Sequence, residues 1–176
     1  MKLFGMTLKA LAVAMVLGGA ALMPALAADS PQIEALKVYM GTWKGTGSIR
    51  GQDKQDVTCK MSLNAGNGGK LNYTGRCSIA GAQLSVTGTI AWNVDNKRYE
   101  AVMNSGIGGF RGVAVGQQTG GSIIFDLKQR ADDDEGNDIT IASKVVLSGA
   151  KISVDFHAVF NDSGDTIDAT VPFTRT

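Results

Sequence analysis

The chain contains one histidine, His157, which makes it the first candidate for a metal ligand, a haem ligand or a general base. It lies between Phe156 and Ala158, on the polar side of a run in which apolar and polar residues alternate. Side chains on that side of a strand point away from the apolar face, so we interpret His157 as a surface residue. A hydrolase triad has no other histidine to use, and no Gly-x-Ser-x-Gly motif occurs. The sequence predicts no catalytic residue and a protein that is not an enzyme.

The two cysteines, Cys59 and Cys77, could form a disulfide or hold a metal. An even number of cysteines in an exported protein favours a disulfide. The Cys-x-x-Cys motif of redox proteins is absent, and a zinc site needs more ligands than two cysteines and one histidine can easily supply. We predict a disulfide, no metal site and no cofactor. The alternative is two buried free thiols.

The strongest charge run is the segment 132–138, Asp-Asp-Asp-Glu-Gly-Asn-Asp. A calcium loop needs oxygen ligands at alternate positions and a glycine at the sixth. Counted from Asp132 the glycine is fifth, and counted from Asp133 the sixth residue is Asp138. We therefore interpret this segment as a solvated hairpin loop. The glycines of 106–109 resemble a phosphate-binding loop only loosely because no helix follows them.

The first 27 residues have the features of a secretory signal. Lys2 and Lys9 form a positive start, the run 11–22 is apolar, and Ala25-Leu26-Ala27 is an A-x-A cleavage site. We expect cleavage before Ala28, a periplasmic location and no stable membrane insertion afterwards. A transmembrane anchor is the alternative reading of this segment.

Charge and length limit the possible partners of the remaining single domain, residues 28–176. The leader holds two of the 17 basic residues and none of the 16 acidic ones, so 15 basic and 16 acidic side chains remain, a net charge of −1. A nucleic-acid partner would call for a clustered basic face, which this balance does not favour. The arginines are scattered over different runs, and we expect them to face solvent; they include Arg50, Arg76, Arg98 and Arg111.

One short helix precedes a long series of strands. Ser30 suits an N-cap, Pro31 suits the first helical position, and Gly41 ends a segment with helical apolar spacing over 31–40. After Gly41 the apolar period changes to two, as in 57–63, 71–79, 84–92, 123–127 and 152–160. Alternation of this kind predicts antiparallel strands with one dry face.

Turn signals separate ten strand-like runs, and no second helical pattern interrupts them. Neighbours in sequence are then expected to pair, and a meander of this length tends to close because closure removes its edges. We predict an all-β fold, an antiparallel up-and-down barrel of eight to ten strands with one short N-terminal helix. The alternative is a sandwich of two sheets.

The register of one hairpin can be worked out from the sequence. If Asn67-Gly68-Gly69 forms the loop, the numbers of paired residues sum to 136, and Cys59 and Cys77 satisfy this sum. The two cysteines would then face each other on adjacent strands, within reach of a disulfide.

Gly41-Thr42-Trp43 at the start of the first strand resembles the opening of the calycin, or lipocalin-like, barrels. This resemblance implies that Arg175 packs over Trp43, and we expect both to form a structural anchor beside the 31–40 helix. The longer pattern Gly41-x-Trp43-x-Gly45-x-Gly47 also resembles nitrobindin-type haem barrels, which implies a haem ligand in a late strand, where His157 lies.

The cysteine pair is similar to that of small bacterial periplasmic protease-inhibitor barrels and of uncharacterised exported proteins of Gram-negative bacteria. Two functions remain open at this point. One is a periplasmic barrel that binds a small, mostly apolar ligand. The other is a protein-binding module with a filled barrel, either a protease inhibitor or an envelope-assembly factor with another envelope protein as its partner.

Overall fold

The computed structural model describes residues 29–51, 54–79, 81–106, 110–132 and 136–176, so the predicted signal segment lies outside the described residues. It contains one helix and ten strands. The helix α1 is Pro31–Lys37. The strands are β1 Gly41–Arg50, β2 Gln55–Ala65, β3 Leu71–Ile79, β4 Ala82–Asn93, β5 Arg98–Ser105, β6 Arg111–Thr119, β7 Ser122–Asp132, β8 Asp138–Ser148, β9 Lys151–Phe160 and β10 Thr166–Arg175.

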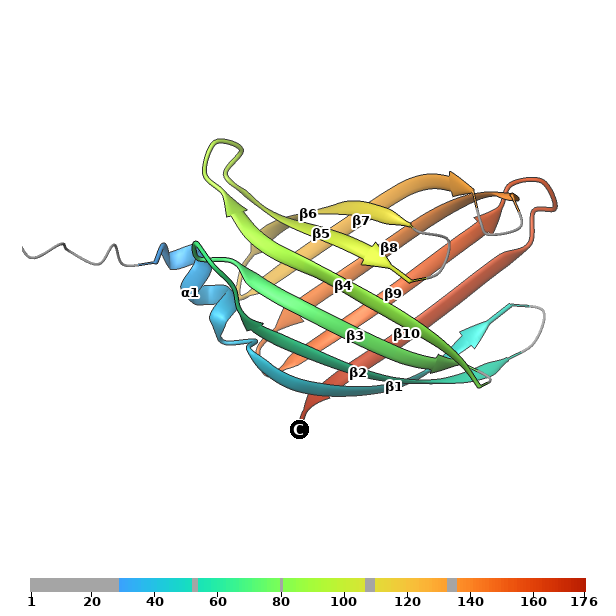
Figure 1. The fold of residues 1–176 in the computed structure, drawn as a ribbon, viewed down its shortest axis with the longest axis horizontal. Helices are drawn as coiled ribbons and strands as arrows, with labels where there is room; N and C mark the ends of the chain where they lie inside the picture. The colour runs from blue at the N-terminus through green and yellow to red at the C-terminus, as the bar shows by residue number, and fades with distance from the viewer. Residues whose placement is uncertain (1–28, 52–53, 80, 107–109, 133–135) are drawn as a thin grey trace, which may run out of the picture.

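The ten strands form a closed antiparallel barrel in which each strand pairs with its neighbours in sequence and β1 pairs with β10. The predicted up-and-down barrel is confirmed, with ten strands, and the two-sheet alternative is wrong. Helix α1 lies at one end of the barrel (Figure 1). We call this the helix end. The opposite end, reached by the loops after β1, β3, β7 and β9, is called the open end.

Helix α1 is short and is fixed at both of its ends. The Ser30 side chain accepts a hydrogen bond from the Ile33 amide, and Ile33 and Leu36 are buried. The helix ends at Lys37, three residues before the predicted end. The amides of Tyr39 and Met40 donate to carbonyls three residues back, a tighter turn than the α-helix makes.

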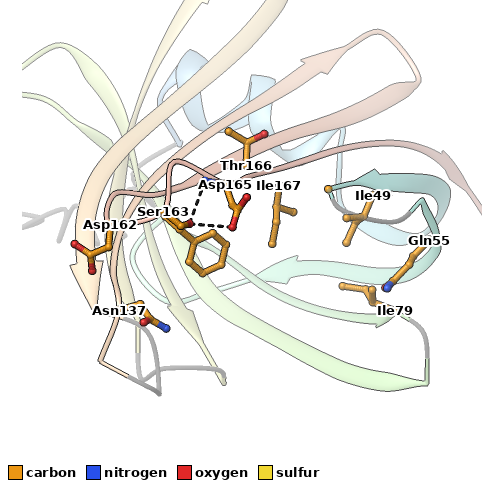
Figure 2. A pocket seen from close by; sticks show the side chains of 11 residues that line it. Ile49, Gln55, Ile79, Asn137, Asp162, Ser163, Asp165, Thr166 and Ile167 are labelled. Carbon is orange, nitrogen blue, oxygen red and sulfur yellow. Dashed lines mark hydrogen bonds between the residues drawn. The ribbon is translucent and has the colours of Figure 1, made fainter.

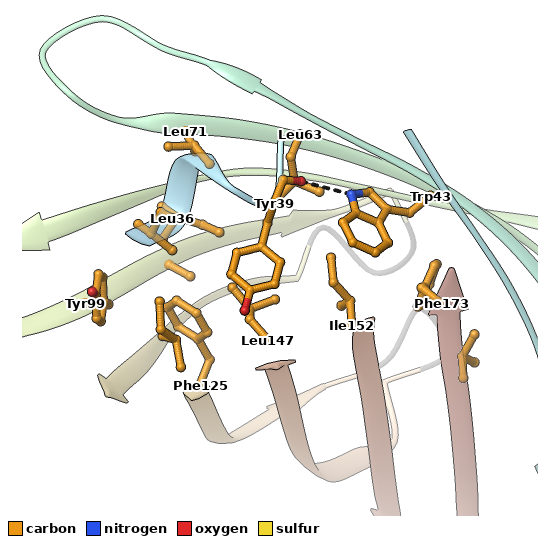
Figure 3. Close-up of a cluster of buried hydrophobic side chains, with 14 of the residues drawn as sticks. Leu36, Tyr39, Trp43, Leu63, Leu71, Tyr99, Phe125, Leu147, Ile152 and Phe173 are labelled. Carbon is orange, nitrogen blue, oxygen red and sulfur yellow. Dashed lines mark hydrogen bonds between the residues drawn. The ribbon is translucent and has the colours of Figure 1, made fainter. Parts of the chain in front are cut away.

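The core is concentrated at the helix end. Its fully buried side chains are Leu36, Trp43, Leu71, Tyr99 and Ile152, and no polar or charged side chain is buried among the described residues. Figure 3 shows these side chains with their neighbours from β2, β7, β8 and β10 under the helix. Towards the open end some inward side chains, among them Ile49 and Ile79, are only half-buried, whereas Val57 and Ile141 remain buried. The barrel is therefore filled more completely at the helix end.

The glycines of β1 allow a close approach to β10. A Cβ atom on Gly47 would lie 2.1 Å from the carbonyl oxygen of Thr170, a distance that no side chain can adopt. The backbones of the first and last strands can thus come together at this point. The glycine-rich start of the first strand serves the closure of the barrel.

The β2–β3 hairpin has the predicted register. Cys59 is opposite Cys77, and Ala65 is opposite Leu71. The two cysteines form a disulfide that joins positions 18 residues apart. The predicted disulfide is confirmed, and the free-thiol alternative is wrong.

Candidate functional site

A cavity of about 660 Å³ lies at the open end of the barrel. It is lined from the ends of strands and from the loops that join them, by Ile49, Gly51, Gln55, Ile79, Asn137, Phe160, Asp162, Ser163, Asp165, Thr166 and Ile167. Figure 2 shows Ile49, Ile79 and Ile167 around one space, with Asp162 and Asn137 at its far side. The volume is within the range of small-molecule sites.

The apolar wall of the cavity follows from strand alternation. Ile49 is on the same inward face of β1 as Trp43, and Ile79 is on the same face of β3 as Leu71. At the helix end these faces are fully buried, whereas Ile49 and Ile79 are half-buried and line the cavity. The strands thus present one continuous apolar lining that is covered at one end and accessible at the other.

The polar side of the cavity is the β9–β10 loop, residues 161–165, which hydrogen bonds hold in place. The amide of Phe160 donates to the carbonyl of Asp165 at 2.9 Å, and the amide of Gly164 donates to the carbonyl of Phe160 at 2.8 Å. The Ser163 hydroxyl donates to the Asp165 carboxylate at 2.9 Å. These bonds close the loop on itself and fix the position of the carboxylate.

The same loop is attached to strand β8. The amide of Asn161 donates to the carbonyl of Asp138 at 2.8 Å, and the Thr140 hydroxyl donates to the Asn161 side chain at 3.1 Å. Arg130 donates through Nε to the Asp138 carboxylate at 2.7 Å. This arginine lowers the pKa of Asp138, so that carboxylate is charged and already paired.

The Tyr73 side chain lies across strand β4 on its inner face, over Gly88. Its hydroxyl donates to the carbonyl of Val102 at 3.0 Å, and a Cβ atom on Gly88 would lie 2.4 Å from that hydroxyl oxygen. Burial raises the pKa of Tyr73 to about 12, which keeps the hydroxyl protonated and able to donate. The side chain links β3 to β5 across β4 and stiffens this wall.

The predicted anchor residues meet at the helix end. Trp43 is completely buried, and its indole N–H donates to the carbonyl of Tyr39 at 2.9 Å. The Arg175 guanidinium lies 4.8 Å from the centroid of the Trp43 ring. It also donates to the carbonyls of Val38 and Met40, the latter at 2.9 Å. The contact that the resemblance implied is present, and its effect on stability remains a prediction.

His157 lies on the outer face of β9, with its side chain 46% exposed, and its Nδ1 is 2.7 Å from a carboxylate oxygen of Asp168. The structure therefore does not place it inside the barrel, and the haem-ligand position implied by the nitrobindin resemblance is wrong for this residue. A shallow outer hollow lies nearby, with Lys128, Lys144 and Asp155 among its lining residues. No cluster of three or more metal-ligating side chains occurs in the described ranges.

Two sequence predictions fall partly outside the described residues, namely 133–135 of the acidic run and 107–109 of the glycine-rich segment. The site at the open end was not predicted from the sequence. The signal available was a polar turn, 161–164, that follows an alternating strand and contains a carboxylate. No helix of the described chain is long and apolar enough to cross a membrane.

No family model and no curated protein matches the chain. The crystal structure of Rv2717c from M. tuberculosis is similar, with a TM-score of 0.65 and 16% identity over 85% of this chain and 99% of that chain. At this identity the likeness shows the fold alone.

Two other solved structures have TM-scores below 0.5. One is a de novo designed fluorescence-activating beta barrel, with a TM-score of 0.41 and 14% identity over 81% of this chain and 97% of that chain. The other, EF1p2_mFAP2b bound to DFHBI, has a TM-score of 0.44 and 11% identity over 82% of this chain and 98% of that chain.

Proposed function

We propose that this protein is an exported, non-enzymatic binding barrel of the calycin type that takes a small, mostly apolar ligand at its open end. One observation carries the proposal. A cavity of about 660 Å³ has Ile49, Ile79, Phe160 and Ile167 in its wall, at the accessible end of a barrel that is otherwise filled. Apolar lining with a few polar groups at the edge is the usual composition of small-molecule sites.

The distribution of burial supports a single entrance. Trp43 and Leu36 are 0% exposed at the helix end, so a ligand cannot enter there without unfolding the core. The inward side chains at the open end are already separated around the cavity. Ligand binding would cover apolar surface that the fold leaves accessible, which is favourable in water.

The neutral fluorescent probe N-phenyl-1-naphthylamine tests this proposal directly. We expect its emission to rise and shift to the blue on binding, because the cavity excludes water from an aromatic ring. Ile79→Trp fills the cavity, and we expect it to weaken probe binding by about tenfold or more, since a tenfold change needs only a small loss of contact energy. A thermal melt of this variant would show that it folds.

Ile124→Trp is the matched control, because Ile124 alternates with the buried Ile123 and Phe125 and so lies on the outer face of β7. This variant should fold and bind the probe like the wild type. Failure of the wild type to bind would contradict the proposal and favour the protein-binding module with a filled barrel. Equal binding by wild type and Ile79→Trp would place the probe elsewhere and would also contradict it.

Export to the periplasm is part of the same proposal. The support is the signal-like segment 1–27 together with the Cys59–Cys77 disulfide, a bond typical of oxidising compartments. Intact-mass measurement of protein recovered from the periplasm should show a chain that begins at Ala28 and carries the disulfide. A chain that retains residues 1–27, recovered from the cytosol only, would contradict export.

A further inference from the structure

We propose that the ligand of the open-end cavity carries a positive charge, so that its chemical class is a small amphiphile with an apolar body and an ammonium or similar cationic head. This inference rests on the proposed function, because it concerns the same cavity. It is drawn from the charges that line the cavity, from the bonds that hold them and from the aromatic residue that lines the same cavity.

Among the residues that the structure describes, the charged side chains that line the cavity are both acidic, Asp162 and Asp165. The remaining polar lining side chains are neutral, namely Gln55, Asn137, Ser163 and Thr166. No lysine or arginine of the described chain contributes to the lining, although Arg50 and Lys54 are nearby in sequence. The head of an anionic ligand would have to lie beside two carboxylates, whereas a cationic head would be attracted to both.

The carboxylates project from a loop whose conformation is already fixed. Asp165 accepts from the Ser163 hydroxyl, and its backbone carbonyl accepts from the Phe160 amide. The neighbouring Asn161 is bonded to β8 through both its amide and its side chain. These groups therefore lose little conformational entropy when a ligand binds, which favours a higher affinity.

Arg130 of β7 is a basic residue whose charge bears on this edge of the cavity. It forms an ion pair with Asp138, which raises the pKa of the guanidinium, and the charge of Asp162 raises it further. Within the described part of the chain, neither Asp162 nor Asp165 forms an ion pair with a basic side chain. Asp165 is thus available to a cation from outside, and Asp162 is shared between such a cation and the charge of Arg130.

Phe160 gives the cationic head a second favourable neighbour. It is the last residue of β9, it lines the same cavity, and its amide is hydrogen-bonded to Asp165. The face of an aromatic ring attracts cations, so a ring beside two carboxylates favours an alkylammonium group over a hydrated metal ion. The apolar body of the ligand would extend towards Ile49 and Ile79.

Three displacers of equal chain length test the inference: decyltrimethylammonium, decanoate and decanol, each used as monomer against bound N-phenyl-1-naphthylamine. We expect decyltrimethylammonium to bind about tenfold more tightly than decanoate, as two screened carboxylate contacts would produce. Asp162→Asn combined with Asp165→Asn should reduce this preference to about twofold, with the probe affinity of the variant measured first so that both displacers are compared on the same scale. The wild-type preference should also shrink at about 0.5 M salt, because the charges are exposed.

Asp95→Asn combined with Asp126→Asn is the matched control, since it removes two exposed carboxylates that do not line the cavity. This control should keep the full preference for decyltrimethylammonium. If the control variant loses the preference, the effect comes from net charge and the inference is overturned. If the wild type binds the probe but has equal affinity for decyltrimethylammonium and decanoate, the inference about charge is overturned and the proposed function stands. No binding of the probe would overturn the proposed function itself.

Discussion

Trp43→Ala should lower the free energy of unfolding by about 3–5 kcal/mol, the range for removing a large buried aromatic side chain. The indole is completely buried, and its N–H donates to the carbonyl of Tyr39, so both packing and a hydrogen bond are lost. The turn that follows helix α1 contacts this ring, with the ring centroids of Tyr39 and Trp43 6.4 Å apart. We expect the helix to detach from the barrel in this variant.

Urea unfolding of Trp43→Ala, Arg175→Ala and the double variant would measure the effect and its coupling. Arg175→Ala should cost less, because a cation over an aromatic ring contributes about 0.5–2 kcal/mol according to its desolvation. The double variant should lose less stability than the sum of the two single losses, and the difference should be of that size. Arg130→Ala is the control, since its guanidinium is largely exposed to solvent and this variant should unfold close to the wild-type urea concentration. A Trp43→Ala protein that unfolds at the wild-type urea concentration would contradict the role of Trp43.

The Cys59–Cys77 disulfide should also make a large contribution to stability. It closes a loop between positions 18 residues apart, for which the chain-entropy model gives about 3 kcal/mol. Cys59→Ala combined with Cys77→Ala should therefore lower the free energy of unfolding by about that amount. Alanine is preferred to serine because Cys59 is buried and a hydroxyl there would lack a partner.

A reducing agent provides the internal control for this second prediction. Reduction should destabilise the wild type by nearly the same amount and should leave the double alanine variant unchanged. If reduction destabilises the variant equally, the effect does not come from the Cys59–Cys77 bond. If the wild type is unchanged by full reduction, verified by thiol titration, the bond does not stabilise the fold.

The sequence contained enough information for the strand order and for one register. Alternation at 71–79 and 152–160 located two strands and their inward faces, and the turn at Asn67-Gly68-Gly69 placed Cys59 opposite Cys77. Local rules were sufficient here because each strand pairs with its neighbour in sequence. The same reasoning placed His157 on the outer face, as the structure does.

The cavity could not be predicted in this way. Ile79 and Leu71 are on the same face of the same strand, and alternation does not distinguish the half-buried from the buried one. The difference arises because helix α1 and the large rings fill one end only, which depends on contacts between distant elements. Asp162 and Asp165 similarly look like ordinary turn residues until the closure of the barrel brings their loop next to Ile49 and Ile79.

The number of strands also depended on closure. Eight and ten strands were both compatible with the turn signals, because a weak strand can be read as a long loop. The pairing of β1 with β10, from Trp43 opposite Arg175 to Arg50 opposite Asp168, shows that all ten runs take part in the barrel. A close approach that only glycine permits, at Gly47, is part of this closure.

The most direct test of the binding site is a map of methyl chemical shifts during titration with N-phenyl-1-naphthylamine. We expect the largest shifts at Ile49, Ile79 and Ile167, which line the cavity, and little change at Ile124 on the outer face or at the buried Ile152. Largest shifts at outer-face methyls, or no shift at the three cavity isoleucines at saturation, would contradict a binding site at the open end.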